Sequence, residues 1–562
     1  MIGLSARRRR RPVAILRASD RRFRAHELAV GAIEWRGATV REMDVASGPA
    51  MRRASDARWD DARDLRSGAR VLTCAHVAAA IVVALAIRLY HLGYAPLWFD
   101  EIDTAQWASA AVGEMLHTVV SYEPAGNFDP YQMPLYFIVV NLWSKIAGLS
   151  AEALRFPGAL LSVATVALIA VLADALLDAR AARRAAWLAA ISPYLVHHAQ
   201  DARMYPLLCA LAAASLLLLA RFLRGNSDRL GIAFVVTNVA LMLTHYYAFF
   251  VIAAELATLV VVHPARKRAW VPGFAATAVA AAGLLYVALA LTPHRSGDVY
   301  RLGSMAFPGA IWSVLSGYTL LPSSEELHRI GAQAARPYLP YATASGLALI
   351  AIAAVAMRRM DTVARIVVLA TIASVAVGPF VAHIVFPGIS VNPRYLIAGA
   401  PAFIVLLAAG MPDRLRLDGR SAATIVIVAV MIVGTIRHLS DPAQKREDVA
   451  AAGRWLRANV PVDEPVLVTS AEMAIIARYT WPDRTFLLYP DKSVVADAGN
   501  AERLAAGIPW NGRRRVLYMF GRDWVSDPDG RLQRAVIGRY APCPGTEVRG
   551  IRLRCIRALA GG

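Results

Sequence analysis

The chain has 562 residues, of which 57% are hydrophobic and only 18% are charged, and its mean hydropathy is +0.44. Because soluble domains carry about 25% charged residues, this composition excludes disorder for most of the chain and argues against a soluble enzyme. The net charge of +20 comes from basic residues dispersed among apolar segments, so we expect no nucleic-acid partner. The four cysteines include no Cys-x-x-Cys pair and predict no structural zinc site. These features favour a polytopic membrane protein.

Residues 1–70 are rich in arginine and lack an apolar stretch that could serve as a signal peptide. One alternative is a basic arm in the cytoplasm that contacts anionic lipid, or a disordered tail without that role. The other is a misassigned start, with translation beginning near Met43 or Met51. In both cases the folded part begins near residue 71.

Residues 71–440 contain apolar segments of nearly the length that a membrane crossing needs, about 20 residues. The candidates are 71–91, 133–149, 156–177, 185–199, 204–220, 230–246, 247–263, 270–291, 341–357, 366–385, 395–411 and 421–437. Three basic residues occur in each of the loops 178–184, 221–229, 263–269, 358–365 and 412–420. Since positive charge collects on the cytoplasmic side, we expect these loops inside and the acidic loop 92–132 outside.

The number of crossings between the acidic loop and the first basic loop must be odd, but two candidates lie between them. We expect 133–149 not to cross, because it is short and carries Asn141, Ser144 and Lys145 on one helix face. Such a helix is typical of the membrane interface. A short crossing with a local reversal is the alternative. Eleven crossings then place the C-terminus outside.

The unusual polar residues fall on the side assigned to the outside. They occur in the segments Trp98–Glu101, Asp129–Pro134, Arg155–Pro157, His197–Tyr205, Thr244–Tyr247 and Asn392–Tyr395. Singly, each could be an interface anchor or a solvated group. Together, a carboxylate beside Trp98 and Phe99 suits a general base, and several arginines suit a phosphate. Glu255 lies within an expected crossing, and there we expect its carboxyl group to form a structural hydrogen bond.

These motifs resemble those of the GT-C integral-membrane glycosyltransferases. They are most similar to bacterial members of glycosyltransferase family 39, which are related to protein O-mannosyltransferases and lipid A aminoarabinose transferases. The resemblance covers about residues 71–440 and rests on Asp100-Glu, Pro134-Leu-Tyr, Leu154-Arg-Phe-Pro, Gln200-Asp-Ala-Arg-Met-Tyr, Thr244-His-Tyr-Tyr and Pro393-Arg-Tyr. It implies a helical bundle with interfacial helices in the first outside loop. It also implies sugar transfer from a polyprenyl phosphate to a glycan, lipid or protein acceptor outside the bacterial cytoplasmic membrane.

By this resemblance Asp100 is the expected catalytic residue, with Glu101 in support. The expected substrate and phosphate contacts are Gln132, Arg155, Asp201, Arg203, Tyr205, His245, Tyr246, Arg394 and Tyr395. Some relatives have a lysine just before the proline that opens the interfacial helix, where this chain has Gln132 and Met133. The phosphate contacts would then fall to the arginines. Some relatives bind a divalent metal, but this sequence offers no clear ligand set beyond the single candidate His245.

A single carboxylate acting as base predicts inversion at the anomeric carbon, whereas a double displacement needs a second carboxylate, for which Glu101 or Asp201 would serve. A lipid-linked sugar flippase or another transporter is the alternative function, and a receptor-like or scaffold protein is a third. Transporters often contain internal repeats and polar residues near the midplane. The sequence has no clear repeat, which favours the transferase.

From residue 441 to 562 the composition is that of a small α/β domain, expected outside. The expected strands are 466–469, 485–489, 516–520 and 551–556, and the expected helices are 441–459, 471–479, 499–507 and 529–538. Cys543 and Cys555 would lie in an oxidising compartment, where they form either a disulfide or two packed thiols. Cys74 and Cys209 lie in expected crossings and are expected to be ordinary core residues.

Overall fold

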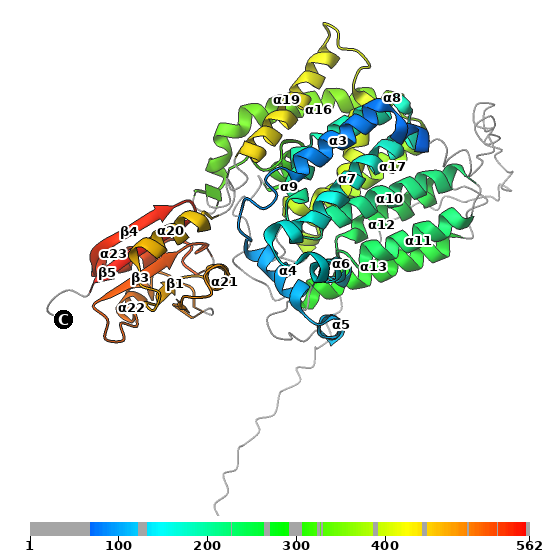
Figure 1. The fold of residues 1–562 in the computed structure, drawn as a ribbon. Coiled ribbons are helices and arrows are strands. Elements are labelled where there is room, and N and C mark those ends of the chain that lie inside the picture. Colours follow the sequence, from blue (N-terminus) through cyan, green and yellow to red (C-terminus); the bar gives the residue numbers. More distant parts are fainter. Residues whose placement is uncertain are drawn as a thin grey trace, which may run out of the picture. The chain divides into compact units, whose positions relative to one another are not determined.

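The computed structural model describes residues 68–121, 132–225, 228–262, 270–291, 306–322, 326–327, 330–385, 392–440, 447–491, 494–524 and 526–557. Helices occupy most of the described chain up to Ser440, and a mixed α/β domain follows from Val449 (Figure 1). The basic segment 1–70 lies almost wholly outside the described residues.

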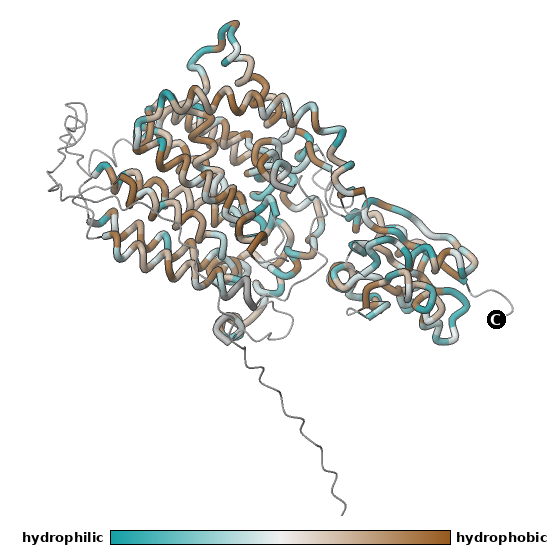
Figure 2. Tube along the Cα trace, turned by 180° about the vertical axis from the view of Figure 1, so that it is seen from behind, coloured by the Kyte–Doolittle hydropathy of each residue, from teal (hydrophilic) through white to brown (hydrophobic). Residues whose placement is uncertain are grey.

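Long apolar sequences explain the helical part, because only helices and closed barrels satisfy their backbone hydrogen bonds in lipid. Its helices are α3 (Ala75–Leu89), α4 (Phe99–Ser109), α5 (Val112–Ser121), α6 (Pro134–Ala147), α7 (Ala151–Leu176), α8 (Ala179–Ala190), α9 (Pro193–Ala199), α10 (Tyr205–Arg224), α11 (Asp228–Met242), α12 (Ala248–Val262), α13 (Val271–Leu291), α14 (Ala306–Ser316), η3 (Gly331–Tyr338), α16 (Leu339–Arg359), α17 (Thr362–Val385), η4 (Pro393–Gly399), α18 (Ala400–Gly410) and α19 (Gly419–Ser440). Apolar residues predominate along them (Figure 2).

Six helical segments of the described chain are long and apolar enough to cross a membrane. They are α7, α10, η3 with α16, α17, η4 with α18, and α19. Further apolar helices are shorter, and α6, which we expected at the interface, is one of them. A mainly helical, multi-pass membrane protein with a small C-terminal α/β domain is therefore confirmed.

The expected crossing at 185–199 is not one helix, which corrects our prediction. The chain breaks between α8 and α9, where Ser192 is the N-cap and Pro193 the first residue of α9. Proline cannot follow a helical turn without losing a hydrogen bond. Arg88 of α3 donates to the carbonyl oxygen of Ala190 at 3.0 Å, so the end of α8 keeps a partner inside the apolar bundle.

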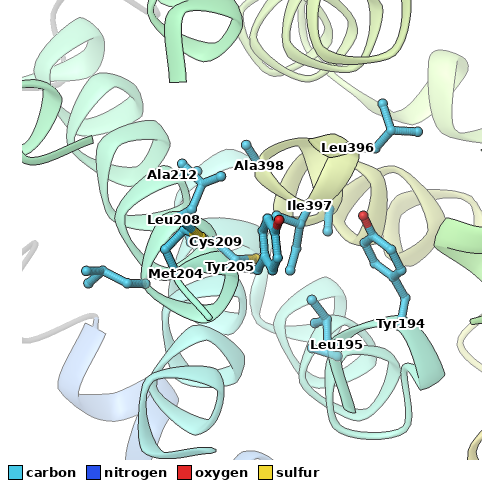
Figure 3. Packing of buried hydrophobic residues seen from close by; sticks show 14 of the residues in the cluster. Tyr194, Leu195, Met204, Tyr205, Leu208, Cys209, Ala212, Leu396, Ile397 and Ala398 are labelled. Atoms are coloured by element: carbon cyan, nitrogen blue, oxygen red, sulfur yellow. The ribbon is translucent and has the colours of Figure 1, made fainter. Parts of the chain in front are cut away.

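The buried core next to the break connects α9, α10 and η4 (Figure 3). The Tyr194 hydroxyl of α9 donates to the Pro393 carbonyl of η4 at 2.6 Å. Cys209 is buried in this core, and both Cys209 and Cys74 are free thiols. This packing holds the segments from which two arginines of the site project.

The C-terminal domain contains a five-stranded sheet in the order β2-β1-β3-β5-β4. Its elements are α20 (Val449–Asn459), β1 (Val466–Val468), α21 (Ala471–Thr480), β2 (Phe486–Leu488), α22 (Ala501–Ala506), β3 (Arg515–Phe520), α23 (Arg531–Arg539), β4 (Ala541–Val548) and β5 (Ile551–Arg557). Strands β2, β1 and β3 are parallel, and β5 runs antiparallel to both β3 and β4. The predicted alternation of strands and helices is thus present, although α20 begins at Val449 and residues 441–446 are outside the described chain.

Strand β4 was not predicted, because Pro542 and Pro544 lie within it. Proline is tolerated in an edge strand, where one side has no ladder partner, and β4 is at the edge of the sheet. Cys543 of β4 lies opposite Cys555 of β5, and the two form a disulfide. Of the two alternatives for these cysteines, the bonded one is realised.

Candidate active site

Helix α4 carries Asp100 and Glu101 in its first turn. Trp98 is its N-cap, and the amide of Trp98 donates to the Glu101 carboxylate at 3.3 Å, as in a capping box. Negative charge is favoured at this end of a helix. Since consecutive helical residues point about 100° apart, the two acids face different surroundings.

Glu101 faces the protein interior and forms a bidentate ion pair with Arg155 of α7. Both Glu101 oxygens accept hydrogen bonds from Arg155 at 2.6 Å, and the Glu101 side chain is completely buried. The remaining Arg155 donors reach the carbonyl oxygens of Leu92, Ala95 and Pro96. Every N–H group of Arg155 is therefore used within the protein. This geometry does not support the prediction that Arg155 contacts the donor phosphate, and it makes Glu101 a structural neighbour of Asp100.

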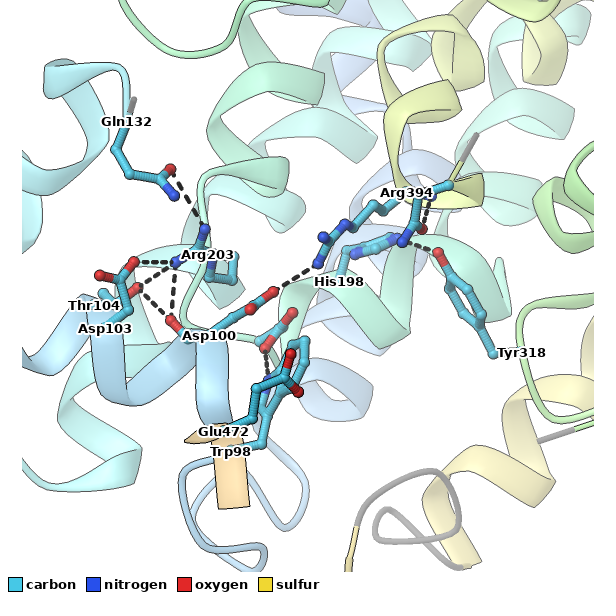
Figure 4. A network of polar contacts seen from close by, with 12 residues as sticks. Trp98, Asp100, Asp103, Thr104, Gln132, His198, Arg203, Tyr318, Arg394 and Glu472 are labelled. Atoms are coloured by element: carbon cyan, nitrogen blue, oxygen red, sulfur yellow. Dashed lines mark hydrogen bonds and ion pairs between the residues drawn. The ribbon is translucent and has the colours of Figure 1, made fainter. Parts of the chain in front are cut away.

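Asp100 faces a partly open region and pairs with Arg394 of η4 at 2.6 Å (Figure 4). The exposed fractions of the two side chains are 16% for Asp100 and 26% for Arg394. Burial by itself would raise the pKa of Asp100, but the positive charges of Arg394, Arg203 and Arg522 outweigh it and lower the pKa below its ordinary value. Asp100 is therefore an ionised carboxylate with access to solvent.

Arg203, in the turn before α10, connects three parts of the site. One terminal nitrogen donates to the carbonyl oxygen of Asp100 and to the Asp103 carboxylate, both at 2.9 Å, and the other lies 3.4 Å from the Gln132 side-chain oxygen. Its Nε is buried and has no hydrogen-bond partner among the described residues. Burial would lower the pKa of Arg203, but Asp100 and Asp103 raise it, so Arg203 is a cation.

Aromatic side chains surround the second guanidinium. The Arg394 guanidinium carbon lies 5.8 Å from the ring centre of Tyr205 and 5.6 Å from that of Tyr395. Both are within the range of a cation–π contact. The ring centre of His245 lies 6.0 Å from the ring centre of Tyr205 and 5.5 Å from that of Tyr395. His245 thus belongs to the same cluster, as the sequence predicted.

His245 is a poor metal ligand in this arrangement. Its Nδ1 accepts a hydrogen bond from the Tyr247 amide at 3.1 Å, so the hydrogen of the neutral ring is on Nε2. Burial, with the positive charges of Arg394 and Arg203, lowers the pKa of His245 to about 3. Where the chain is described, no three His, Cys, Asp or Glu side chains gather to hold a metal ion. His245 therefore offers an N–H donor and not a metal-binding lone pair.

The structure thus brings together most of the predicted site residues. Those near Asp100 and the two cations are Gln132, Arg203, Tyr205, His245, Arg394 and Tyr395. Asp201 is buried, and its carboxylate accepts a hydrogen bond from the Trp98 indole at 2.8 Å. Tyr246 is only half-buried and packs against the bundle core.

Sequence reasoning missed Asp103, which shares Arg203 with the backbone of Asp100. A signal was present, since Asp103 follows Asp100 by three residues and side chains at that spacing share a helix face. The role of the Trp98 indole had no such signal, because its partner Asp201 is far away in the sequence.

With this geometry in place, comparison with known proteins identifies the class. Residues 130–292 match the family model described as dolichyl-phosphate-mannose-protein mannosyltransferase. The match includes Gln132, Arg203 and His245. This match supports a membrane glycosyltransferase of the GT-C type, the class that the motifs predicted.

The match covers less than a third of the chain, so it indicates a class and not a particular activity. No curated protein matches the chain. ArnT from Cupriavidus metallidurans bound to undecaprenyl phosphate is similar in structure, with 14% identity, a TM-score of 0.48, and 86% of this chain and 98% of that chain covered. The archaeal oligosaccharyltransferase AglB from Archaeoglobus fulgidus, in complex with an inhibitory peptide and a dolichol-phosphate, has 13% identity, a TM-score of 0.43, and coverage of 86% and 74%. Because both TM-scores are below 0.5, these similarities support no conclusion about the substrates of this chain.

Proposed function

We propose that this protein transfers a sugar from a polyprenyl-phosphate donor to an acceptor hydroxyl, with Asp100 as the general base. The observation that carries the proposal is the 2.6 Å pair between Asp100 and Arg394, which places an accessible carboxylate beside a cation. Arg203 and the Nε2–H of His245 add positive charge and a donor nearby. A base beside an anion-binding group is what such a transfer requires.

The leaving group in this reaction is a lipid phosphate, and its negative charge must be stabilised as the sugar departs. Arg394 and Arg203 are the cations with this task, because guanidinium groups bind phosphate through paired hydrogen bonds. Arg155 has no donor left for it. Aromatic rings of Tyr205 and Tyr395 keep the Arg394 guanidinium in place.

Binding of the donor also makes Asp100 a stronger base. In the empty site Arg394 donates to Asp100 and lowers its pKa. A bound phosphate shares the charge of Arg394, so the pKa of Asp100 rises toward its ordinary value. Asp100 then accepts the proton of the acceptor hydroxyl while that oxygen attacks the anomeric carbon and the sugar–phosphate bond breaks.

Glu101 and Asp201, the two expected candidates for a second carboxylate, are buried, which favours single displacement and inversion. Glu101 has no exposed surface and is held by Arg155, and Asp201 is buried against Trp98. A nucleophile for double displacement would have to reach the sugar carbon, and both of these side chains are buried within the protein.

We place the site and the C-terminal domain on the outer face of the bacterial cytoplasmic membrane. The arginine-rich loops support this orientation through the positive-inside rule. The Cys543–Cys555 disulfide supports it too, because disulfides persist in oxidising compartments. The acceptor class, whether glycan, lipid or protein, stays open.

Mass spectrometry of lipid extracts tests the proposal. We expect a polyprenyl-phosphate sugar to accumulate in a strain that lacks the gene and in one complemented with Asp100→Asn, but not in one complemented with the wild type. The Asn variant must be present in membranes at the wild-type level. An Asp100→Asn strain with the wild-type lipid profile would overturn the assignment of the base. An unchanged profile in the deletion strain, once redundant enzymes are removed, would favour the transporter alternative.

A further inference from the structure

The loop after strand β3 of the C-terminal domain contacts helix α4 of the site. Arg522 follows this strand, and its guanidinium carbon lies 5.7 Å from the ring centre of Trp98 and 5.6 Å from that of Phe99. These two residues immediately precede Asp100. The ring of Trp524, 5.3 Å away, is a third aromatic contact of the same guanidinium. A residue more than four hundred positions away thus meets the turn that carries the proposed base.

Acidic side chains of the C-terminal domain also bind the Arg522 guanidinium. Its Nε lies 3.0 Å from the Glu472 carboxylate of α21 and 3.4 Å from that of Glu447. Only 14% of the Arg522 side chain is exposed. Figure 4 shows Glu472 and Trp98 in the same network as Asp100. The Arg522 guanidinium is therefore largely shielded from water, with aromatic rings and carboxylates as its specific partners.

The backbone of this loop is braced on both sides of Arg522. Arg522 has a φ of 49°, in the left-handed region that non-glycine residues rarely adopt. The carbonyl oxygen of Gly521 accepts the Ser470 hydroxyl at 2.8 Å, and Asp523 pairs with Arg552 of β5 at 2.7 Å. Such conformations persist where the surrounding structure over-determines them, and they cluster at functional sites.

We propose that Arg522 is a positioning residue of the catalytic centre, which holds Trp98 and Phe99 from the C-terminal domain and so fixes the carboxylate of Asp100 against the two cations. The inference rests on the proposed function and deepens it. Trp98 transmits the contact, since its indole also donates to Asp201, whose carbonyl oxygen accepts the Arg203 amide at 2.8 Å. The C-terminal domain therefore completes the site.

The charge of Arg522 also acts on Asp100. The described charged and titratable groups around that carboxylate come from several elements. They are Arg394 of η4, Arg203 before α10, Tyr205 of α10, Arg522 and Glu472 of the C-terminal domain, Glu101 and Asp103 of α4, Asp201, and His245 between α11 and α12. The three arginines lower the pKa of Asp100. Removal of one of them raises this pKa, so Asp100 is already protonated at a higher pH. The acidic limb of the pH–activity profile therefore moves to higher pH.

The test uses the full-length protein in detergent. The donor is the lipid that accumulates in the deletion strain, envelope membranes of that strain supply the acceptor, and release of polyprenyl phosphate is measured against pH. For Arg522→Gln we expect kcat/KM to fall on the order of 10-fold to 100-fold, as misplacement of a catalytic group does. We also expect the acidic limb to move to higher pH. Arg522→Lys keeps the charge, so its limb stays near the wild-type position while its rate remains reduced.

Arg515→Gln is the matched control, because Arg515 begins the same strand and pairs with Glu464 away from α4. The rate of Arg515→Gln and the position of its acidic limb should equal those of the wild type. The folded fraction of each variant is measured by size exclusion and thermal unfolding, and rates are given per folded molecule. An Arg522→Gln variant with an unmoved limb and a wild-type rate per folded molecule would overturn the inference. That result leaves the proposed function intact if Asp100→Asn is inactive, whereas an active Asp100→Asn variant refutes the function itself.

Discussion

Two neighbouring acids in one helical turn have different environments. Asp100 is partly exposed and shares its surroundings with three arginines, whereas Glu101 is buried in a bidentate pair with Arg155. Both residue types could act as the base. The direction in which each side chain leaves the helix gives the two acids different surroundings. At this scale the sequence indicated the acidic pair and the arginines as candidates, but it could not divide the arginines into those held by internal hydrogen bonds and those open to a substrate.

The Glu101–Arg155 pair predicts a stability effect. Glu101→Gln keeps the size of the side chain but leaves the buried Arg155 charge without its carboxylate, which costs about 3–5 kcal/mol. We expect a clear drop in the thermal unfolding midpoint of the full-length protein in detergent. The control is Glu547→Gln, which removes the exposed partner of Arg554 and should change stability by about 0–1 kcal/mol. Equal midpoints for the two variants would contradict the structural role of Glu101.

At the scale of elements, close helix packing depends on a small residue that sequence patterns do not reveal. Helix α18 crosses α16 at Gly410, where an added Cβ would lie 2.2 Å from the carbonyl oxygen of Ile352. Backbone cannot move aside as a flexible side chain can. The glycine therefore permits the crossing of the two helices.

Gly410→Ala is accordingly expected to destabilise the bundle by about 1–3 kcal/mol, as overpacking does. Gly346→Ala on α16 is the matched control, because an added Cβ there meets no atom within 4 Å. Alanine is also the better helix former at such a position, so this control should be neutral or stabilising. Thermal unfolding of both variants in the same detergent decides the question. A loss of the same size at both positions would contradict the packing role of Gly410, because helix propensity favours alanine at both.

Local patterns predicted elements well where they agreed with tertiary packing. They failed at 185–199, where Pro193 divides an apolar segment and Arg88 stabilises the end of α8. They also failed at β4, because its prolines are compatible only with the edge of a sheet. Both failures come from partners that lie far away in the sequence.

At the scale of the whole molecule, the loop charges predict which face the site occupies. Impermeant thiol reagents can test this in intact spheroplasts, with single cysteines introduced at exposed positions. Leu417 in the basic loop 412–420 and Val462 in the C-terminal domain are both exposed. We expect Val462→Cys to be labelled and Leu417→Cys to be labelled only after the membrane is opened. The wild type, with its free Cys74 and Cys209, gives the background. Labelling of Leu417→Cys in intact cells would reverse the proposed orientation.

The amino-acid sequence predicted the membrane class, the α/β domain and most of the residues that lie together near Asp100. It could do so because apolar length, loop charge and strand–helix alternation are local properties of the chain. Three-dimensional packing was needed to show that Asp100 and not Glu101 is accessible, that internal hydrogen bonds occupy Arg155, and that Arg522 contacts α4. These are contacts between segments far apart in the chain, and burial and direction, which set the chemistry of a charged group, exist only after those segments have packed.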